Sequence, residues 1–128
     1  MKLRLSLIVL IGLAAASAGC RHSPDRPSLT VKTFIEKINK NDVEGPVTLL
    51  STHYLSGPGG ANFARGMVVF SMGALHNAGG VKSVDTVSES VTGNSAKVTV
   101  RLTYNSGRYE ELTYNLVKEK NQWKIDSF

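Results

Sequence analysis

The stretch Ala96-Lys97-Val98-Thr99-Val100-Arg101-Leu102-Thr103-Tyr104 (residues 96–104) decides the fold class. Apolar and polar side chains alternate along it with a period of two, which is the pattern of a β-strand with one buried face. The same alternation recurs at residues 112–116 and 123–125. Short turn sequences rich in glycine, asparagine or lysine separate these stretches. We therefore expect an antiparallel meander of four strands that starts near Val81.

The residues before this meander have the period of α-helices instead. One helical face is formed by Val31, Phe34, Ile35 and Ile38. This helix follows Pro27, and Ser28 is placed to cap its first turn. A second short helix is expected over residues 43–50, because Pro46 is tolerated in a first turn.

A third helix is predicted from about Ala61 to Ala78, between the breaker sequence 56–60 and Gly79-Gly80. Its apolar stripe consists of Phe63, Met67, Phe70, Ala74 and Ala78. Helices first and strands afterwards predict an α+β domain, with the N-terminal helices packed on one face of the antiparallel sheet.

The first 20 residues have the three-part layout of a secretory signal peptide. Lys2 and Arg4 make the start positive, a 12-residue apolar core runs from Leu5 to Ala16, and small residues lead into Cys20. The apolar core is too short to cross a bilayer, which takes about 20 residues. We expect a signal peptide over residues 1–19 that is removed by cleavage.

Ala18-Gly19-Cys20 resembles the lipobox of bacterial lipoproteins, although Ser17 stands where that motif usually has leucine. The resemblance implies that Cys20 carries lipid and anchors the chain to a membrane of the bacterial cell envelope. Cys20 is the only cysteine, so no internal disulfide competes for it. Arg21 is not the aspartate that favours inner-membrane retention, so the outer membrane is preferred by resemblance. An ordinary secretory signal that carries a cysteine near its cleavage site is the alternative.

Residues 20–27 form a short polar tether with two prolines, and residues 28–128 form one folded domain. The whole chain has a formal charge of +5, and without Lys2 and Arg4 it retains 13 basic and 10 acidic residues. These basic residues are scattered along the chain rather than clustered with aromatic residues. This distribution argues against a nucleic-acid partner.

The order of elements resembles the nuclear transport factor 2-like (NTF2-like) superfamily, and more narrowly the small bacterial lipoproteins of the DUF4878 type, some of which carry a lumazine-binding label. The residues that carry the resemblance are Val31-Lys32-Thr33-Phe34-Ile35, Asn41-Asp42, Tyr104 with Gly107, and Trp123-Lys124-Ile125. It implies an NTF2-like or cystatin-like cone, in which a curved four-stranded sheet wraps the N-terminal helices around a pocket. The superfamily includes both enzymes and non-catalytic modules, so the pocket lining decides the chemistry.

No catalytic or metal-binding set stands out in the sequence, and no cofactor is expected. Glu110 falls on the inward side of its strand but sits beside a turn, where an exposed charge is the simpler interpretation. His53 and His76 lack the local spacing of a metal site. Ser51, Thr52 and Ser56 have no acidic residue near them in sequence.

We expect a membrane-tethered, non-catalytic module that binds a small ligand or a protein partner. The residues expected to line or fill its hollow are Tyr54, Phe63, Met67, Phe70, Tyr104, Tyr114 and Trp123. The alternative is an isomerase- or hydrolase-type enzyme, which needs a buried carboxylate or histidine in an open pocket. A homodimer is also left open, although the polar outer face of strand 96–104 argues against a large apolar interface there.

Overall fold

The computed structural model describes residues 26–128. The predicted signal peptide, Cys20 and the tether up to Asp25 lie outside the described residues. The described part contains four helices followed by four strands. Their bounds are α1 Pro27–Asn39, α2 Glu44–Thr48, α3 Thr52–Leu55, α4 Gly60–Asn77, β1 Val81–Thr92, β2 Ser95–Tyr104, β3 Tyr109–Glu119 and β4 Gln122–Ser127.

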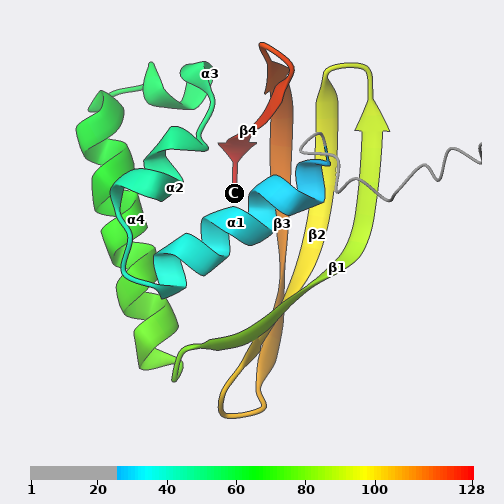
Figure 1. The fold of residues 1–128 in the computed structure, drawn as a ribbon. Helices are drawn as coiled ribbons and strands as arrows, with labels where there is room; N and C mark the ends of the chain where they lie inside the picture. The colour runs from blue at the N-terminus through cyan, green and yellow to red at the C-terminus, as the bar shows by residue number, and fades with distance from the viewer. Residues whose placement is uncertain (1–25) are drawn as a thin grey trace, which may run out of the picture.

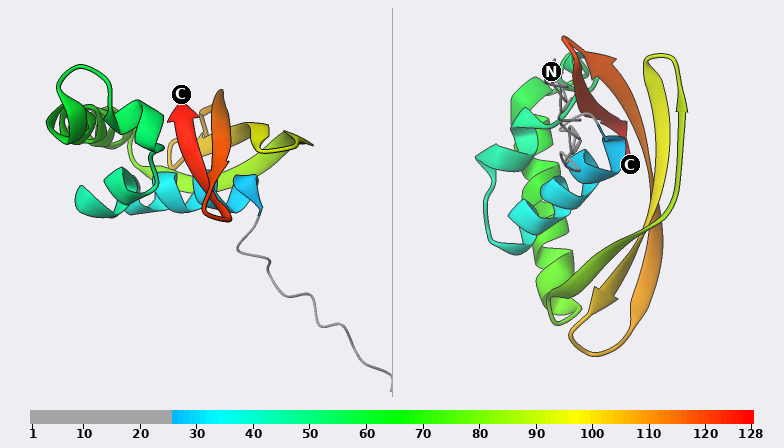
Figure 2. Two further views of the ribbon diagram at one scale, coloured as in Figure 1. Left: turned by 90° about the horizontal axis from the view of Figure 1, so that it is seen from above. Right: turned by 45° about the vertical axis from the view of Figure 1, so that its right-hand side comes forward.

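The four strands form one antiparallel sheet in the order β1-β2-β3-β4. The sheet curves, and α1 lies across its concave face while α4 stands beside α1 (Figure 1). The right-hand view of Figure 2 shows the helices to one side of the curved sheet. The predicted α+β architecture with a four-stranded meander is confirmed.

The core lies between α1 and the concave face of the sheet. Val31, Phe34, Ile35 and Ile38 on α1 are each at most 2% exposed, as their helical spacing predicts. The inward residues of β2 are buried too, and they are Ala96, Val98, Val100, Leu102 and Tyr104. Both predicted buried faces are confirmed. Each element packs against one surface only, so the spacing of its apolar residues indicates which side is buried.

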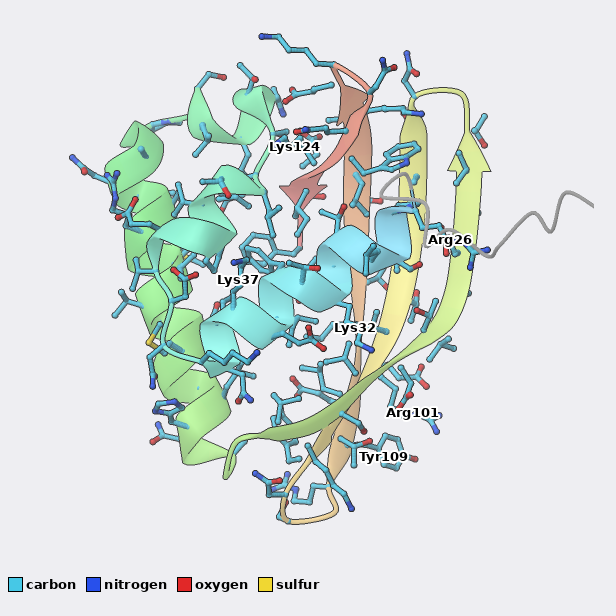
Figure 3. The ribbon with its side chains drawn as sticks, viewed as in Figure 1. Arg26, Lys32, Lys37, Arg101, Tyr109 and Lys124 are labelled. Carbon is cyan, nitrogen blue, oxygen red and sulfur yellow. The ribbon has the colours of Figure 1, made fainter. Side chains whose placement is uncertain are left out.

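The outward face of the sheet carries a row of polar contacts. The hydroxyls of Thr99 and Thr113 are 2.9 Å apart, and Arg101 donates to a carboxylate oxygen of Glu111 at 2.9 Å. The Arg101 guanidinium also lies 4.6 Å from the ring centre of Tyr109 (Figure 3). These cross-strand pairs match the polar outer face expected from the sequence.

Helix α1 begins at Pro27, two residues earlier than a helix capped by Ser28 would begin. Arg26 is its N-cap residue and makes no side-chain capping bond, so the prediction that Ser28 caps this helix is wrong. Proline suits the first helical position because its fixed φ fits the helix and its missing N–H has no acceptor there.

Helix α4 buries a different face from the predicted stripe. Its buried residues are Ala64, Val68 and Leu75, whereas Phe63 and Phe70 are 54% and 72% exposed. The helix is apolar on most sides, so periodicity alone does not select the buried face. The small Ala64 permits the close approach of α4 to α1 and α2, which a phenylalanine at that position would prevent.

Gly59 and Gly60 lie where the preceding loop ends and α4 begins. Gly59 has φ +82°, and a Cβ on it would lie 2.8 Å from the Cβ of Phe63. A side chain here would be strained both by the left-handed backbone and by this contact. The glycine-rich sequence 56–60, predicted to interrupt helix formation, therefore meets a conformational requirement of this turn.

A short segment after α2 extends the sheet beyond β4. Leu50 forms a parallel bridge with Ile125. The Ser51 N–H donates to the Ile125 carbonyl, and the Ile125 N–H donates to the Leu49 carbonyl, both at 2.8 Å. The chain then continues into α3, a helix that was not predicted from the sequence. This segment joins the helical layer to the last strand.

Candidate functional site

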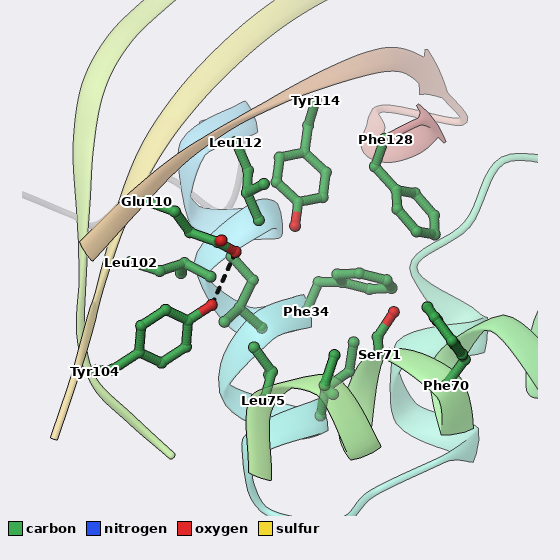
Figure 4. A pocket seen from close by; sticks show the side chains of 13 residues that line it. Phe34, Phe70, Ser71, Leu75, Leu102, Tyr104, Glu110, Leu112, Tyr114 and Phe128 are labelled. Atoms are coloured by element: carbon green, nitrogen blue, oxygen red, sulfur yellow. Dashed lines mark hydrogen bonds between the residues drawn. The ribbon is translucent and has the colours of Figure 1, made fainter. Parts of the chain in front are cut away.

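A cavity of about 160 Å³ lies between α1, α4 and the concave face of β2 and β3 (Figure 4). Its walls are mostly apolar. The lining residues are Phe34, Ile35, Ile38, Phe70, Ser71, Ala74, Leu75, Leu102, Tyr104, Glu110, Leu112, Tyr114 and Phe128. Apolar walls with a few polar groups are typical of ligand sites, although most such sites are larger than this one.

The alternation of the strands places the polar groups of this cavity. Leu102 pairs with Glu110, and Val98 pairs with Tyr114, in the antiparallel register of β2 and β3. Since side chains alternate between the two faces of a sheet, Glu110, Leu112 and Tyr114 all point to the concave side. The neighbouring Glu111 points to the other face, where it meets Arg101.

Aromatic rings form one wall of the cavity. The rings of Phe34 and Tyr114 meet edge to face with their centres 6.2 Å apart. The Phe128 ring lies 5.5 Å from the centre of Phe34 and 5.9 Å from that of Tyr114. Tyr54 stacks on the outer side of Phe128 at 5.7 Å. Such pairs hold one another in place beyond simple burial, so the wall is preformed.

Glu110 and Tyr104 form the polar end of the cavity. The Tyr104 hydroxyl donates to Oε1 of Glu110 at 2.8 Å (Figure 4). Burial, together with this hydrogen bond and the Glu110 charge, raises the pKa of Tyr104 to about 12. The Tyr104 phenol therefore remains a protonated donor at neutral pH.

Tyr114 and Ser71 point further hydroxyls into the cavity (Figure 4). Burial raises the pKa of Tyr114 above its ordinary value, and the nearby Glu110 and Tyr104 raise it too. Its phenol is thus neutral at physiological pH. Neither hydroxyl forms a side-chain hydrogen bond within residues 26–128, so both are available to hydrogen-bond a ligand.

A polar hollow of about 420 Å³ adjoins this cavity. It shares Ala74, Tyr104 and Glu110 with the apolar cavity, and its own residues include Arg108. Glu110, which is exposed, therefore stands at the boundary between the two spaces. The carboxylate is reachable from solvent as well as from the apolar side.

Of the residues expected to line the hollow, Phe70, Tyr104 and Tyr114 do so. Tyr54 does not line the cavity but stacks on Phe128, which does, and Phe63 is exposed on α4. Neither Met67 nor Trp123 lines it, and Trp123 is buried on β4 with Lys118 over its ring at 5.7 Å.

Several wall residues were not among those expected. Phe34, Leu102 and Leu112 were assigned to the general core because periodicity cannot separate a filled interior from a cavity wall. Phe128 carries no periodic signal at all, since it follows the last strand. The inward position of Glu110 was the one sequence signal that the cavity contains a polar group.

Ser51 and Thr52 have acidic partners in the structure, contrary to the expectation from the sequence. The Ser51 hydroxyl donates to Oδ1 of Asp126 at 2.6 Å, and the Thr52 hydroxyl donates to Glu119 at 3.1 Å. Both carboxylates come from the β3–β4 hairpin, more than 60 residues away in sequence. Separation along the chain concealed them.

Ser51, His53 and Asp126 do not form a catalytic triad, although the three residue types meet. Nδ1 of His53 lies 3.0 Å from Oδ1 of Asp126, the same oxygen that Ser51 contacts. A triad needs the histidine between the serine and the carboxylate. Ser51 is also fully buried, and its oxygen accepts the Tyr54 N–H at 2.9 Å as the N-cap of α3. The cluster is a structural junction.

The described residues contain neither a cluster of potential metal ligands nor a helix that could span a membrane. No group of three or more His, Cys, Asp or Glu side chains between residues 26 and 128 is arranged to hold an ion. None of the helices in the same range combines the length and apolar character that crossing a bilayer requires.

Comparison with known proteins gives matches in structure only. No family model and no curated protein matches the sequence. A candidate NTF2-like transpeptidase from Campylobacter jejuni superposes with a TM-score of 0.69 at 16% identity, over 80% of this chain and 98% of that one. The chain has an NTF2-like fold.

Two further structures agree with this fold. A SEC-C motif containing protein from Rhodopseudomonas palustris superposes on this chain with a TM-score of 0.58 at 12% identity, over 82% of this chain and 78% of that one. A cystatin-fold protein from Novosphingobium aromaticivorans matches with a TM-score of 0.50 at 13% identity, over 79% and 96%. At these identities the likeness establishes the fold and carries no activity with it. The expected NTF2-like or cystatin-like cone is confirmed.

Proposed function

We propose that this NTF2-like domain is a lipid-anchored, non-catalytic binding module that holds a small apolar or aromatic ligand in the cavity between α1, α4 and the sheet. The observation that carries the proposal is the apolar, aromatic-walled cavity with a few inward polar groups. The cavity is not plugged by the side chains expected to fill it, since Phe63 is exposed and Trp123 lies elsewhere.

The size of the cavity limits the ligand. An apolar cavity of about 150 Å³ in another protein binds benzene, so a space of about 160 Å³ suits a ligand body of one ring. A larger ligand would have to extend into the adjoining polar hollow past Glu110. We therefore expect single-ring compounds to bind and fused multi-ring compounds to bind less well.

Titration of the ¹⁵N-labelled protein with benzyl alcohol, followed by NMR, tests the cavity. Chemical-shift changes should centre on the strands and helices around Leu102 and Leu112. Ala74→Phe, which narrows the cavity, should abolish them, whereas Ala61→Phe at an exposed position of the same helix should leave them intact. Equal binding by the wild type and Ala74→Phe would place the ligand elsewhere and refute the proposal.

The membrane anchor in this proposal is lipid on Cys20. Helix α1 begins at Pro27, so six residues separate Cys20 from the helix, with a reach of at most about 20 Å. The domain would then stay close to the envelope membrane, with the outer membrane preferred. More than one acyl chain is needed for stable attachment, and bacterial lipoproteins by resemblance carry two or three.

Labelling of producing cells with an alkyne analogue of palmitate tests the anchor. The wild-type chain should take up label and fractionate with membranes, and Cys20→Ser should do neither. Ser23→Ala, which follows Cys20 and lies outside the lipobox, is the control and should behave as the wild type. A soluble, unlabelled wild-type chain would contradict the lipoprotein part and leave the cavity unaffected.

One observation favours a second candidate, an acid–base enzyme. Glu110 with the protonated Tyr104 beside it is a carboxylate–phenol pair at the edge of an apolar cavity. In other enzymes such pairs move protons on apolar substrates. Against it, Glu110 is exposed, whereas a general base is usually tuned by burial. Turnover of any substrate that is abolished by Glu110→Gln would overturn the binding-module proposal in favour of this one.

A further inference from the structure

We infer that the ligand of this cavity is a small organic cation, with a ring-sized apolar body and a protonated amine or quaternary ammonium group. The inference rests on the proposed function and adds the charge of the ligand. It follows from three features of the cavity: a carboxylate without an ion-pair partner, aromatic rings in the same lining, and no cationic residue in that lining.

The first feature is the state of Glu110. Glu110 is the one carboxylic acid that lines the cavity. Within residues 26–128 no Lys, Arg or His nitrogen lies within 4.0 Å of its carboxylate. Tyr104 satisfies Oε1, but Oε2 has no hydrogen-bond partner among the same residues. A carboxylate with an open oxygen at the edge of an apolar space attracts a cation that also carries apolar surface.

The second feature is the aromatic wall. Phe34, Tyr104, Tyr114 and Phe128 all line the same cavity as Glu110. The negative faces of aromatic rings attract cations, and aromatic cages are the usual receptors of quaternary ammonium groups. A neutral ring would gain from this wall too, but a cation gains more because it also makes a charge-assisted contact with Glu110.

The third feature is the absence of compensating positive charge in the lining. Arg108, whose charge acts on Tyr104, lines the adjoining polar hollow and not the apolar cavity. An anionic ligand placed here would lie beside Glu110 with no donor cation to neutralise it. The Tyr114 and Ser71 hydroxyls can accept a hydrogen bond from an ammonium N–H, so they do not oppose a cation.

Three single-ring probes of similar size separate the outcomes: benzylamine, which is protonated at pH 7, benzyl alcohol and benzoate. We expect NMR titration of the full-length protein to give a dissociation constant about tenfold lower for benzylamine than for benzyl alcohol. Benzoate should bind more weakly than both.

Two variants locate the charge effect. Glu110→Gln keeps the shape of the side chain and should bring benzylamine and benzyl alcohol to within about twofold of each other. Glu111→Gln is the matched control, because Glu111 is adjacent in sequence but pairs with Arg101 on the opposite face of the sheet. It should keep the preference for benzylamine. The NMR spectrum of each variant without ligand shows whether the fold is retained.

The outcomes separate this inference from the proposed function. Equal affinity for benzylamine and benzyl alcohol in the wild type, or tighter binding of benzoate, would overturn the cation inference while the cavity remained a ligand site. A preference for benzylamine that survives Glu110→Gln would also overturn it, since the charge would act elsewhere. Failure of all three probes to bind would refute the proposed function itself.

Discussion

Replacing Ser51 with alanine removes the side chain that joins the helical layer to β4. The Ser51 hydroxyl donates to Asp126 at 2.6 Å and accepts the Tyr54 N–H at 2.9 Å, and the residue is fully buried. Alanine has nearly the same volume, so the change deletes two hydrogen bonds and creates almost no cavity. The backbone bonds from this segment to Ile125 remain.

The expected cost follows from these two bonds. Loss of an N-cap serine costs about 1 kcal/mol of stability. Loss of a hydrogen bond to a charged group costs about 1.5–3 kcal/mol when the partner stays buried. Asp126 is 26% exposed and keeps its contact with His53, so water replaces part of the second bond. We expect Ser51→Ala to lower the free energy of unfolding by about 2 kcal/mol.

Urea denaturation monitored by circular dichroism measures this change directly. The midpoint should fall while the slope of unfolding free energy against urea stays constant. Thermal unfolding should occur about 10 °C lower, since 1 kcal/mol corresponds to about 4–8 °C in a domain of this size. Ser56→Ala is the matched control, because the Ser56 hydroxyl bonds the His53 carbonyl at an exposed position. It should cost less than about 0.5 kcal/mol.

A loss below about 0.5 kcal/mol for Ser51→Ala, equal to that of Ser56→Ala, would refute the reasoning. It would mean that water satisfies Asp126 and the α3 N–H as well as Ser51 does. The junction would then follow from packing around Ile125 rather than from the buried hydroxyl.

Three further predictions concern the cavity and its surroundings. Leu102→Ala should cost about 2–5 kcal/mol in chemical denaturation and admit a larger ring in ligand titrations, because Leu102 is 1% exposed and lines the cavity. Phe63→Ser should change the unfolding free energy by less than about 1 kcal/mol, because the ring is 54% exposed; a loss like that of a core phenylalanine would contradict the observed α4 face. Glu110→Gln should lower the pKa of Tyr104 from about 12 towards its ordinary 10.0 in absorbance titration at 295 nm, and an unchanged pKa would exclude any influence of the carboxylate.

The raised pKa of Tyr104 also affects the stability of the fold at high pH. Its pKa is higher in the folded protein than the ordinary value, so the protonated phenol stabilises the fold. This contribution is complete below pH 10 and is lost as the pH rises through about 12. The stability of Glu110→Gln should decline less steeply over this alkaline range than that of the wild type.

Local pattern sufficed to predict the elements that have one strong amphipathic face. The alternation in residues 96–104 predicted β2 with its buried side, and the spacing of Val31, Phe34, Ile35 and Ile38 predicted the buried face of α1. Short turns between alternating segments predicted the order of the sheet, because neighbouring antiparallel strands need only short connections. The inward position of Glu110 followed from the same alternation.

The tertiary structure alone decided which face of α4 is buried, where the cavity lies and how the helical layer meets β4. Residues on most sides of α4 are apolar, so the choice of Ala64 and Val68 over Phe63 and Phe70 depends on how closely α1 and α2 approach. The Ser51–Asp126 contact spans 75 residues, and Phe128 reaches the cavity from beyond the last strand. Periodicity shows which side of each segment tends to be buried. Contacts between distant segments depend instead on how their side chains pack against one another in the folded protein.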